Sequence, residues 1–274
     1  MKRKLHYKAA TSAALLALGC IGMLGMPAGS ASAYERDSAK PTIVLVHGAL
    51  ADSSCWNGVI AKLQGDGYTV IAAADPLRDL KNDSDYVSLI VKNVKGPVVL
   101  VGHSYGGAII TNAATSAGNV KALIYVAAYA PDEGESAFDL TGQFPGSTLP
   151  GALAPPIALP DGANDLYVQQ DKFRAVFAAD VPEKEAERMA ATQRPVTDAA
   201  LKGASLTTAW RSIPSWFVYG SADMVIPPAA HAFMAERAGA RRTIDVRGAS
   251  HVVMVSHPAV VANLIEEAAT VTAQ

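Results

Sequence analysis

The chain of 274 residues has 23 Lys and Arg against 25 Asp and Glu, which gives a formal net charge of −2 at pH 7. Half of its residues are hydrophobic and 18% are charged, a balance that predicts broad buried surfaces. No basic run occurs beyond the first ten residues, which argues against nucleic acid as a partner.

The first 33 residues have the pattern of an export signal. A basic head at residues 2–8 precedes a mostly apolar stretch at 13–26, and three small residues at 31–33 form a cleavage site. We expect cleavage after Ala33. The mature chain of about 240 residues would begin at Tyr34 and be secreted, as a periplasmic or extracellular protein.

Membrane attachment is the alternative to free secretion. The apolar stretch is short and rich in Gly for a membrane span, so we expect no stable span. Residues 17–20 resemble a bacterial lipoprotein signal, which makes a lipoprotein anchored at Cys20 the second possibility.

Continuous apolar runs alternate with helical patterns from residue 42 onward. The runs predict strands at residues 42–46, 69–73, 98–101, 122–127, 216–219 and 243–246. The helical patterns lie at residues 53–64, 84–95, 105–117, 228–238 and 258–270, with Ser84 as an N-cap and Pro228 and Pro258 in first helical turns. Strands that are apolar on both faces and alternate with helices predict an α/β fold, with a mostly parallel six-stranded sheet flanked by helices. Catalytic groups in such sheets collect at the carboxyl edge of the strands.

The alternation fails between residues 131 and 213. This segment begins rich in Pro and Gly and continues with amphipathic helical patterns near residues 171–179 and 183–193. About eighty residues without a core strand predict a cap inserted over the carboxyl edge. The predicted organisation is a signal peptide at 1–33, a core in two parts at 34–130 and 214–274, and a cap insertion at 131–213.

Apolar side chains of the predicted cap could line a substrate pocket. The candidates are Phe138, Phe144, Leu149, Leu153, Ile157, Leu166, Phe173 and Phe177. The alternative is that most of them only seat the cap on the body of the protein, which is the commoner role of buried apolar residues.

The stretch GPVVLVGHSYGGA at residues 96–108 predicts a buried strand, an abrupt turn and the start of a helix. Ser104 lies at the centre of the turn within Gly102-His103-Ser104-Tyr105-Gly106, which is the pattern of a nucleophile elbow. Such a turn strains the backbone of its central residue and brings the neighbouring chain so close that side chains at 102 and 106 would collide. Ser104 is therefore the predicted catalytic nucleophile.

A serine nucleophile needs a base to accept its proton and a carboxylate to orient that base. His251 lies in a loop between the last predicted strand and the last predicted helix, where it can reach Ser104, and is the predicted base. Asp223 follows the fifth predicted strand and is the predicted carboxylate. The chain order Ser104, Asp223, His251 is that of the triad in α/β hydrolases.

Other residues compete for these two roles. His257 is the alternative base, although its place before Pro258 is typical of a cap or a surface turn. Asp132, after the fourth predicted strand, is the alternative carboxylate. His231 falls inside a helical pattern, which favours a structural or solvated side chain.

Attack on a carbonyl also requires donors for the negative charge that develops on its oxygen. Two backbone N–H groups normally supply them, one from the residue after the nucleophile and one from the loop after the first strand. Here these residues are Tyr105 and Ala49, and Gly48 allows the loop to turn sharply toward the site. Ala49 and Tyr105 form the predicted oxyanion hole.

These motifs resemble those of the α/β-hydrolase superfamily, over essentially the whole chain after the signal. The chain is most similar to the small capped hydrolases that include plant methylesterases, hydroxynitrile lyases and secreted bacterial esterases. The motifs that carry the resemblance are His47-Gly48-Ala49 with Trp56 beyond, residues 102–107, residues 220–223 and Ser250-His251. In the lyase branch a threonine typically replaces Gly48 and a lysine follows the triad histidine, whereas this chain has Gly48 and Val252, which argues against cyanohydrin cleavage.

The resemblance implies a serine hydrolase, of carboxylesterase type, that cleaves an apolar small-molecule ester through an acyl-enzyme. No H-E-x-x-H motif or Cys/His cluster predicts a metal site, and we expect no cofactor. Perhydrolase or haloperoxidase-like activity and lactonase or amidase activity would use the same triad. A ligand-binding role with little turnover is a further alternative, because fold does not fix function. The sequence indicates no oligomeric state.

Overall fold

The computed structural model describes residues 40–272; the predicted export signal, its cleavage site and the alternative lipid anchor at Cys20 lie outside these residues. Six strands form one sheet in the order β2-β1-β3-β4-β8-β9, and all neighbouring strands in it are parallel. The strands are β1 Thr42–Val46, β2 Val70–Ala73, β3 Val98–His103, β4 Val120–Val126, β8 Ser215–Gly220 and β9 Arg242–Val246. The predicted six-stranded α/β fold is confirmed.

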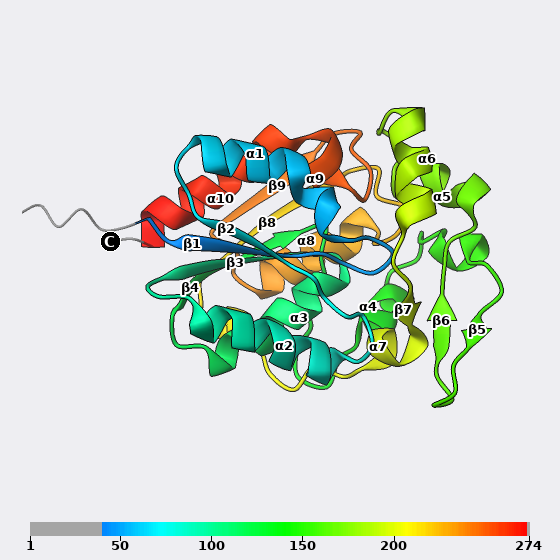
Figure 1. Ribbon diagram of the computed structural model, residues 1–274, viewed down its shortest axis with the longest axis horizontal. Coiled ribbons are helices and arrows are strands. Elements are labelled where there is room, and N and C mark those ends of the chain that lie inside the picture. The colour runs from blue at the N-terminus through cyan, green and yellow to red at the C-terminus, as the bar shows by residue number, and fades with distance from the viewer. Residues whose placement is uncertain (1–39, 273–274) are drawn as a thin grey trace, which may run out of the picture. The chain divides into compact units, whose positions relative to one another are not determined.

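Helices cover both faces of this sheet (Figure 1). α1 and α10 lie on one face, and α2 and α3 lie on the other. The helical elements of the core are η1 Ser53–Trp56, α1 Asn57–Gly65, α2 Leu80–Asn93, α3 Tyr105–Ala113, η2 Ala114–Ser116, α8 Pro228–Arg237, α9 Val253–Ser256 and α10 Pro258–Thr272. Pro228 and Pro258 begin their helices as predicted, because a first-turn N–H has no helical partner to lose. Among the described helices, none combines the length and apolarity that a membrane crossing requires.

The prediction that Ser84 caps the second helix is wrong. α2 begins four residues earlier, and its N-cap is Asp79, whose carboxylate accepts a hydrogen bond from the backbone N–H of Asn82 at 3.0 Å. Asp79 has the extended backbone that an N-cap requires, whereas Ser84 lies inside the helix with its side chain buried. The first turn of α2 is mostly polar, so a search for apolar periodicity places its start too late.

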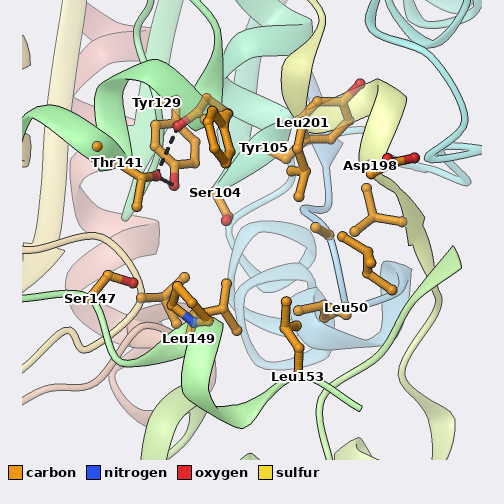
Figure 2. Close-up of a pocket in the computed structure, with 18 of the residues that line it drawn as sticks. Leu50, Ser104, Tyr105, Tyr129, Thr141, Ser147, Leu149, Leu153, Asp198 and Leu201 are labelled. Atoms are coloured by element: carbon orange, nitrogen blue, oxygen red, sulfur yellow. Dashed lines mark hydrogen bonds between the residues drawn. The ribbon is translucent and has the colours of Figure 1, made fainter. Parts of the chain in front are cut away.

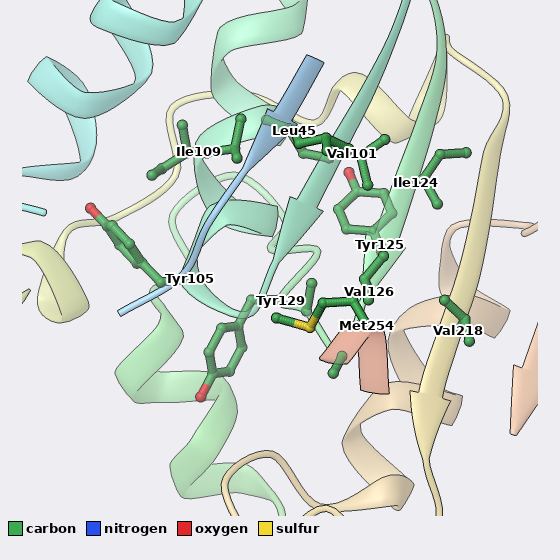
Figure 3. Packing of buried hydrophobic residues seen from close by; sticks show 14 of the residues in the cluster. Leu45, Val101, Tyr105, Ile109, Ile124, Tyr125, Val126, Tyr129, Val218 and Met254 are labelled. Carbon is green, nitrogen blue, oxygen red and sulfur yellow. The ribbon is translucent and has the colours of Figure 1, made fainter. Parts of the chain in front are cut away.

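Aliphatic and aromatic side chains fill the interior around the sheet (Figure 3). Leu45, Val101 and Ile124, from three adjacent strands, are fully buried. Tyr125 stacks on Phe217 of the next strand, with the ring centroids 4.6 Å apart. Burying each such side chain contributes about 1.5–3 kcal/mol to the free energy of unfolding, relative to leaving it exposed. The sheet is therefore stable enough to hold the loops at its carboxyl edge in place.

Residues 131–213, called here the inserted segment, contribute no strand to the main sheet. Its helices α5 (Gln170–Phe177) and α6 (Glu183–Thr192) correspond to the two predicted helical patterns. Its other elements are α4 Ala137–Gln143, η3 Leu149–Ala152, β5 Ile157–Ala158, β6 Asn164–Leu166, β7 Val196–Thr197, α7 Asp198–Lys202 and η4 Ala209–Arg211. β5, β6 and β7 form a small antiparallel sheet that the sequence did not predict. In Figure 1 β5, β6, α5 and α6 gather at one end of the main sheet.

The loop between β2 and α2 holds the inserted segment on the core. The guanidinium of Arg78 pairs with Asp165 of β6 at 2.6 Å and donates to the carbonyl oxygen of Pro195 at 2.8 Å. The hydroxyl of Thr197 in β7 donates to the carbonyl oxygen of Arg78. The backbone N–H of Thr197 donates to the carbonyl oxygen of Leu77. The small sheet is therefore fastened to the core beside the carboxyl edge. We call this set of contacts the Arg78 clamp.

Candidate active site

Ser104 lies at the abrupt turn between β3 and α3, as the sequence predicts. Its backbone has φ 52° and ψ −122°, a strained conformation for a residue with a side chain. The carbonyl oxygen of Ser104 accepts hydrogen bonds from the backbone N–H groups of Gly107, at 3.0 Å, and Tyr129, at 3.1 Å. These bonds stabilise the turn and hold the hydroxyl-bearing residue at the carboxyl edge of β3.

The close approach predicted around the turn is present at both glycines. A Cβ atom on Gly102 would lie 2.5 Å from the carbonyl oxygen of Gly106. A Cβ atom on Gly106 would lie 2.7 Å from the carbonyl oxygen of Val46. Both distances are shorter than van der Waals contact with backbone, so any side chain at either position would displace the turn.

Asp223 follows β8 and is fully engaged in hydrogen bonds. Its Oδ1 accepts from the backbone N–H groups of Val225, at 2.8 Å, and Ile226, at 3.0 Å. Its Oδ2 lies 2.8 Å from Nδ1 of His251 and 3.1 Å from Nε2 of His231. Burial alone would raise the pKa of Asp223, but the two histidines outweigh burial and hold that pKa below its usual range. Asp223 is therefore an ionised, buried carboxylate.

The partner of His251 determines which nitrogen of its ring carries the proton. An ionised carboxylate only accepts hydrogen bonds, so we assign the proton of neutral His251 to Nδ1, the atom that contacts Asp223. Its Nε2 then carries a lone pair, is buried and makes no hydrogen bond within residues 40–272. A general base needs such a nitrogen. In ligand-free enzymes the bond between base and nucleophile is often long and tightens when substrate binds.

The ring of His251 is enclosed by two aromatic neighbours. His103, the residue before Ser104, lies 4.8 Å from it between ring centroids and donates from Nε2 to the carbonyl oxygen of His251 at 3.1 Å. Phe177 of α5 lies 4.9 Å from it on another side. Burial and the nearby His251 ring lower the pKa of His103, which keeps His103 neutral. The loop that carries His251 is thus tied to β3, whose last residue, His103, precedes Ser104.

The structure does not bring the alternative residues into this arrangement. His257 is partly exposed at the start of α10, with Nδ1 2.9 Å from the hydroxyl of Ser256. Asp132 forms an ion pair with Arg211 at 2.6 Å. Neither contacts Asp223 or His251.

His231 is the residue that sequence reasoning misplaced in part. It is structural in the sense of being buried in α8, but it contacts Asp223 directly and is not solvated. Asp223 lies in the loop before α8, so helical spacing does not relate it to His231, and two prolines at 227–228 lie between them. The sequence carried no signal for this pairing, because it depends on how the loop after β8 turns back.

Ala49 and Tyr105 both border the cavity that Ser104 faces. Neither backbone N–H donates a hydrogen bond to another of the described residues, which leaves both able to bind an oxyanion. The side chain of Tyr105 is buried, and its hydroxyl donates to Asp83 of α2 at 3.1 Å. This bond ties the first residue of α3 to the neighbouring helix.

A cavity of about 420 Å³ opens above Ser104 (Figure 2). Its walls are mostly apolar and come from the core loops and from the inserted segment. Six of the eight predicted pocket residues border it: Phe138, Phe144, Leu149, Leu153, Leu166 and Phe177. Ile157 is exposed elsewhere, and Phe173 is buried against Phe177, so these two predictions are wrong.

Few polar groups face this cavity besides Ser104. Tyr129 and Thr141 share a hydrogen bond of 2.6 Å on one wall (Figure 2). Asp198 and Lys202 form an ion pair of 3.0 Å at another side. Within residues 40–272 no group of three or more His, Cys, Asp or Glu is arranged to hold a metal ion. The cavity suits an apolar molecule with one reactive group near Ser104.

A strained serine at a strand-to-helix turn, beneath a cavity at the carboxyl edge of a parallel sheet, is the arrangement of α/β hydrolases. A family model described as the alpha/beta hydrolase family matches residues 43–264. The chain belongs to this family.

Individual relatives agree with this assignment. A pyrethroid hydrolase of Sphingobium wenxiniae is 29% identical over 255 residues, covering 85% of this chain and 89% of that protein. The crystal structure of polyneuridine aldehyde esterase is similar with a TM-score of 0.72 at 18% identity, covering 83% of this chain and 98% of that one. A pyrethroid hydrolase of Sphingobium faniae has a TM-score of 0.67 at 24% identity, covering 84% and 97%. The two solved structures share the fold of this chain, and the family model together with the relative from Sphingobium wenxiniae supports a hydrolase.

Proposed function

We propose that the protein is a secreted serine hydrolase that cleaves carboxylic esters of apolar small molecules through Ser104, His251 and Asp223. The observation that supports this most directly is the pairing of His251 with Asp223, which leaves Nε2 of His251 free to act as a base. The strained Ser104 under a mostly apolar cavity supports the same function.

In the proposed reaction the hydroxyl of Ser104 attacks the ester carbonyl while Nε2 of His251 accepts its proton. The backbone N–H groups of Ala49 and Tyr105 bind the oxyanion, and the carboxylate of Asp223 stabilises the imidazolium. The imidazolium then protonates the leaving alcohol. Water, deprotonated by the same histidine, attacks the acyl-enzyme and releases the acid.

The cavity and the relatives suggest the kind of ester. A volume of about 420 Å³ is within the range of small-molecule sites, and its apolar walls disfavour charged substrates. Relatives are named as a pyrethroid hydrolase and a carbendazim hydrolyzing esterase, the second 30% identical over 128 residues, or 42% of this chain. We propose a neutral ester with apolar groups on both sides of the carbonyl.

Hydrolysis of p-nitrophenyl esters of increasing acyl length tests this function. We expect turnover by the wild-type protein, and a loss of about four to six orders of magnitude in Ser104→Ala, because the triad acts as a unit. Ser147→Ala is the matched control, since Ser147 borders the same cavity away from the turn. It should stay within about threefold of wild type if catalysis requires the serine at the turn.

Labelling with a fluorophosphonate provides a second test that needs no substrate. The wild-type protein and Ser147→Ala should be labelled, and Ser104→Ala should not. Half of the wild-type ester turnover remaining in Ser104→Ala, or failure of the folded wild-type protein both to turn over esters and to react with the probe, would contradict the proposal.

Export is tested separately by expressing the full chain in a bacterial host and measuring the mass of the protein outside the cytoplasm. We expect a chain that begins at Tyr34. A lipid-modified chain that begins at Cys20 would support the anchored alternative, and an uncleaved chain in the cytoplasm would contradict export.

A further inference from the structure

We infer that His231 is a positioning residue, which shares the carboxylate of Asp223 with His251 and sets the pH at which His251 can act as a base. This inference rests on the proposed function of Ser104, His251 and Asp223. It is carried by one contact that a hydrolase triad does not need: a second imidazole on the same carboxylate oxygen.

The two histidines approach Oδ2 of Asp223 from different elements. His251 comes from the loop after β9 and His231 from α8, with distances of 2.8 Å and 3.1 Å. The side chains of all three residues are almost completely buried. The His231 ring also stacks on Tyr219 at 4.8 Å between centroids, with 17° between the planes. Bond and stacking together hold His231 in one orientation.

Both ring nitrogens that face Oδ2 must donate, because an ionised carboxylate only accepts. We therefore assign the proton of His231 to Nε2. Its Nδ1 is buried and has no hydrogen-bond partner among the described residues. Oδ2 of Asp223 thus accepts hydrogen bonds from two imidazole rings at once.

Sharing the oxygen changes what happens when His251 takes up a proton. A hydrogen bond from His231 stabilises the negative charge on Oδ2 and competes for the lone pair that His251 uses. The imidazolium of His251 is then stabilised less than it would be by an unshared carboxylate. His251 therefore stays unprotonated, and active as a base, to a lower pH.

Other ionisable groups surround His251, and none of them changes in the comparison that follows. His103 of β3 packs against its ring, and Asp223 bonds to Nδ1. Asp180, between α5 and α6, accepts a hydrogen bond from the hydroxyl of Ser250, the residue next to His251. His231→Leu leaves these groups in place and removes one donor, whereas His231→Gln leaves them in place and supplies an amide donor.

The test compares His231→Leu with His231→Gln. Leucine has a side chain of similar size but no donor, whereas the side-chain amide of glutamine can place an N–H near the position of Nε2. The quantity measured is kcat/KM for a neutral ester across the acid side of the pH range. In His231→Leu we expect the midpoint of the acid limb to move up by about half a unit to one unit. His231→Gln should keep a midpoint close to that of wild type.

A purely structural role for His231 predicts something else. It would lower the melting temperature and the fraction of active enzyme without moving the midpoint. An unchanged or downward-shifted midpoint in folded His231→Leu, or the same shift in both variants, would overturn the inference.

Nitrogen-15 NMR of the histidine rings gives a readout that needs no turnover, and in the wild-type protein it locates the ring protons without any variant. In the wild-type protein we expect the proton of His231 on Nε2 and that of neutral His251 on Nδ1. A proton on Nδ1 of His231 overturns the inference even if no variant folds. If wild-type protein neither hydrolyses esters nor reacts with a fluorophosphonate, the proposed function fails, and the NMR titration of His251 with and without His231 still decides whether the two rings are coupled.

Discussion

The carboxylate of Asp223 receives four hydrogen bonds, two at each oxygen. Two come from backbone N–H groups of its own loop, which fix the rotamer, and two come from histidines. A buried carboxylate with every acceptor site used has little freedom to rotate. At the scale of one residue, the orientation of His251 is therefore determined by the loop after β8 as well as by its own loop.

Replacing Asp223 by Asn should lower kcat by about 10⁴-fold while the protein remains folded. The amide would donate to one histidine, which favours the wrong proton position on His251 and removes the charge that stabilises its imidazolium. Asp132→Asn is the matched control because Asp132 pairs with Arg211 away from the cavity. A kcat for Asp132→Asn that falls as far as that of Asp223→Asn would contradict the assignment of roles.

At the scale of secondary-structure elements, the Arg78 clamp attaches the small sheet of the inserted segment to the core. β6 and β7 are only two or three residues long, and such a small sheet is marginal by itself. The clamp adds an ion pair and three hydrogen bonds that join it to the loop after β2. The walls of the cavity above Ser104 come partly from this segment, so its attachment determines the shape of the cavity.

Arg78→Ala should loosen the inserted segment more than it destabilises the core. We expect a loss of about 1–3 kcal/mol in the free energy of unfolding, because Asp165 and the carbonyl of Pro195 lose their partner. Limited proteolysis should cut the variant faster within residues 131–213 than wild type. Lys81→Ala, which removes an exposed ion pair to Asp85, should change neither quantity measurably. Equal cleavage rates for wild type and Arg78→Ala would contradict this role.

Each strand of the main sheet was predicted to within two residues, because most of these strands are apolar runs bounded by loops; β9, with the sequence RTIDV, is the least apolar of them. The start of α2 was predicted four residues late, because Asp79 caps a polar first turn. β5, β6 and β7 were not predicted at all, since two or three residues carry no readable period. Local pattern was therefore sufficient for the sheet and insufficient for the inserted segment.

Some features of the candidate site could be predicted from the sequence, and one could not. The turn at Ser104 was predicted because its glycines are a steric requirement that the sequence displays. The positions of Asp223 and His251 after their strands were also readable, since chain order and strand ends place them at one edge. The contact between His231 and Asp223 was not, because no local pattern specifies how a loop folds back on the helix that follows it.

At the scale of the whole molecule, a buried acid after β2 makes stability depend on pH. Asp75 is fully buried; its Oδ1 accepts from the backbone N–H of Leu77, and its Oδ2 has no hydrogen-bond partner among the described residues. Burial and the nearby charge of Asp83 raise the pKa of Asp75 to about 8. The folded protein therefore binds a proton at Asp75 that the unfolded chain loses near pH 4.

The free energy of unfolding should fall as pH rises from about 4 to 8. In this window the folded state holds more protons than the unfolded state, so deprotonation favours unfolding. Asp75→Asn removes this dependence, and we expect it to be more stable than wild type at pH 8 by about 5 kcal/mol and nearly equal at pH 4. Urea denaturation at both pH values measures the difference. A variant that is less stable than wild type at pH 8 would show that Asp75 is charged in the fold.

The left-handed backbone of Ser104 sets a ceiling on how heat-resistant an active form of this protein can be. Glycine tolerates φ 52° without strain, whereas alanine keeps the Cβ atom that opposes it. Ser104→Gly should therefore melt at a higher temperature than Ser104→Ala, by an amount that corresponds to about 0.5–2 kcal/mol, although both variants lack the proposed nucleophile. Selection for thermal stability alone would favour glycine at position 104. A serine at this position would therefore have to be retained for its reactive hydroxyl.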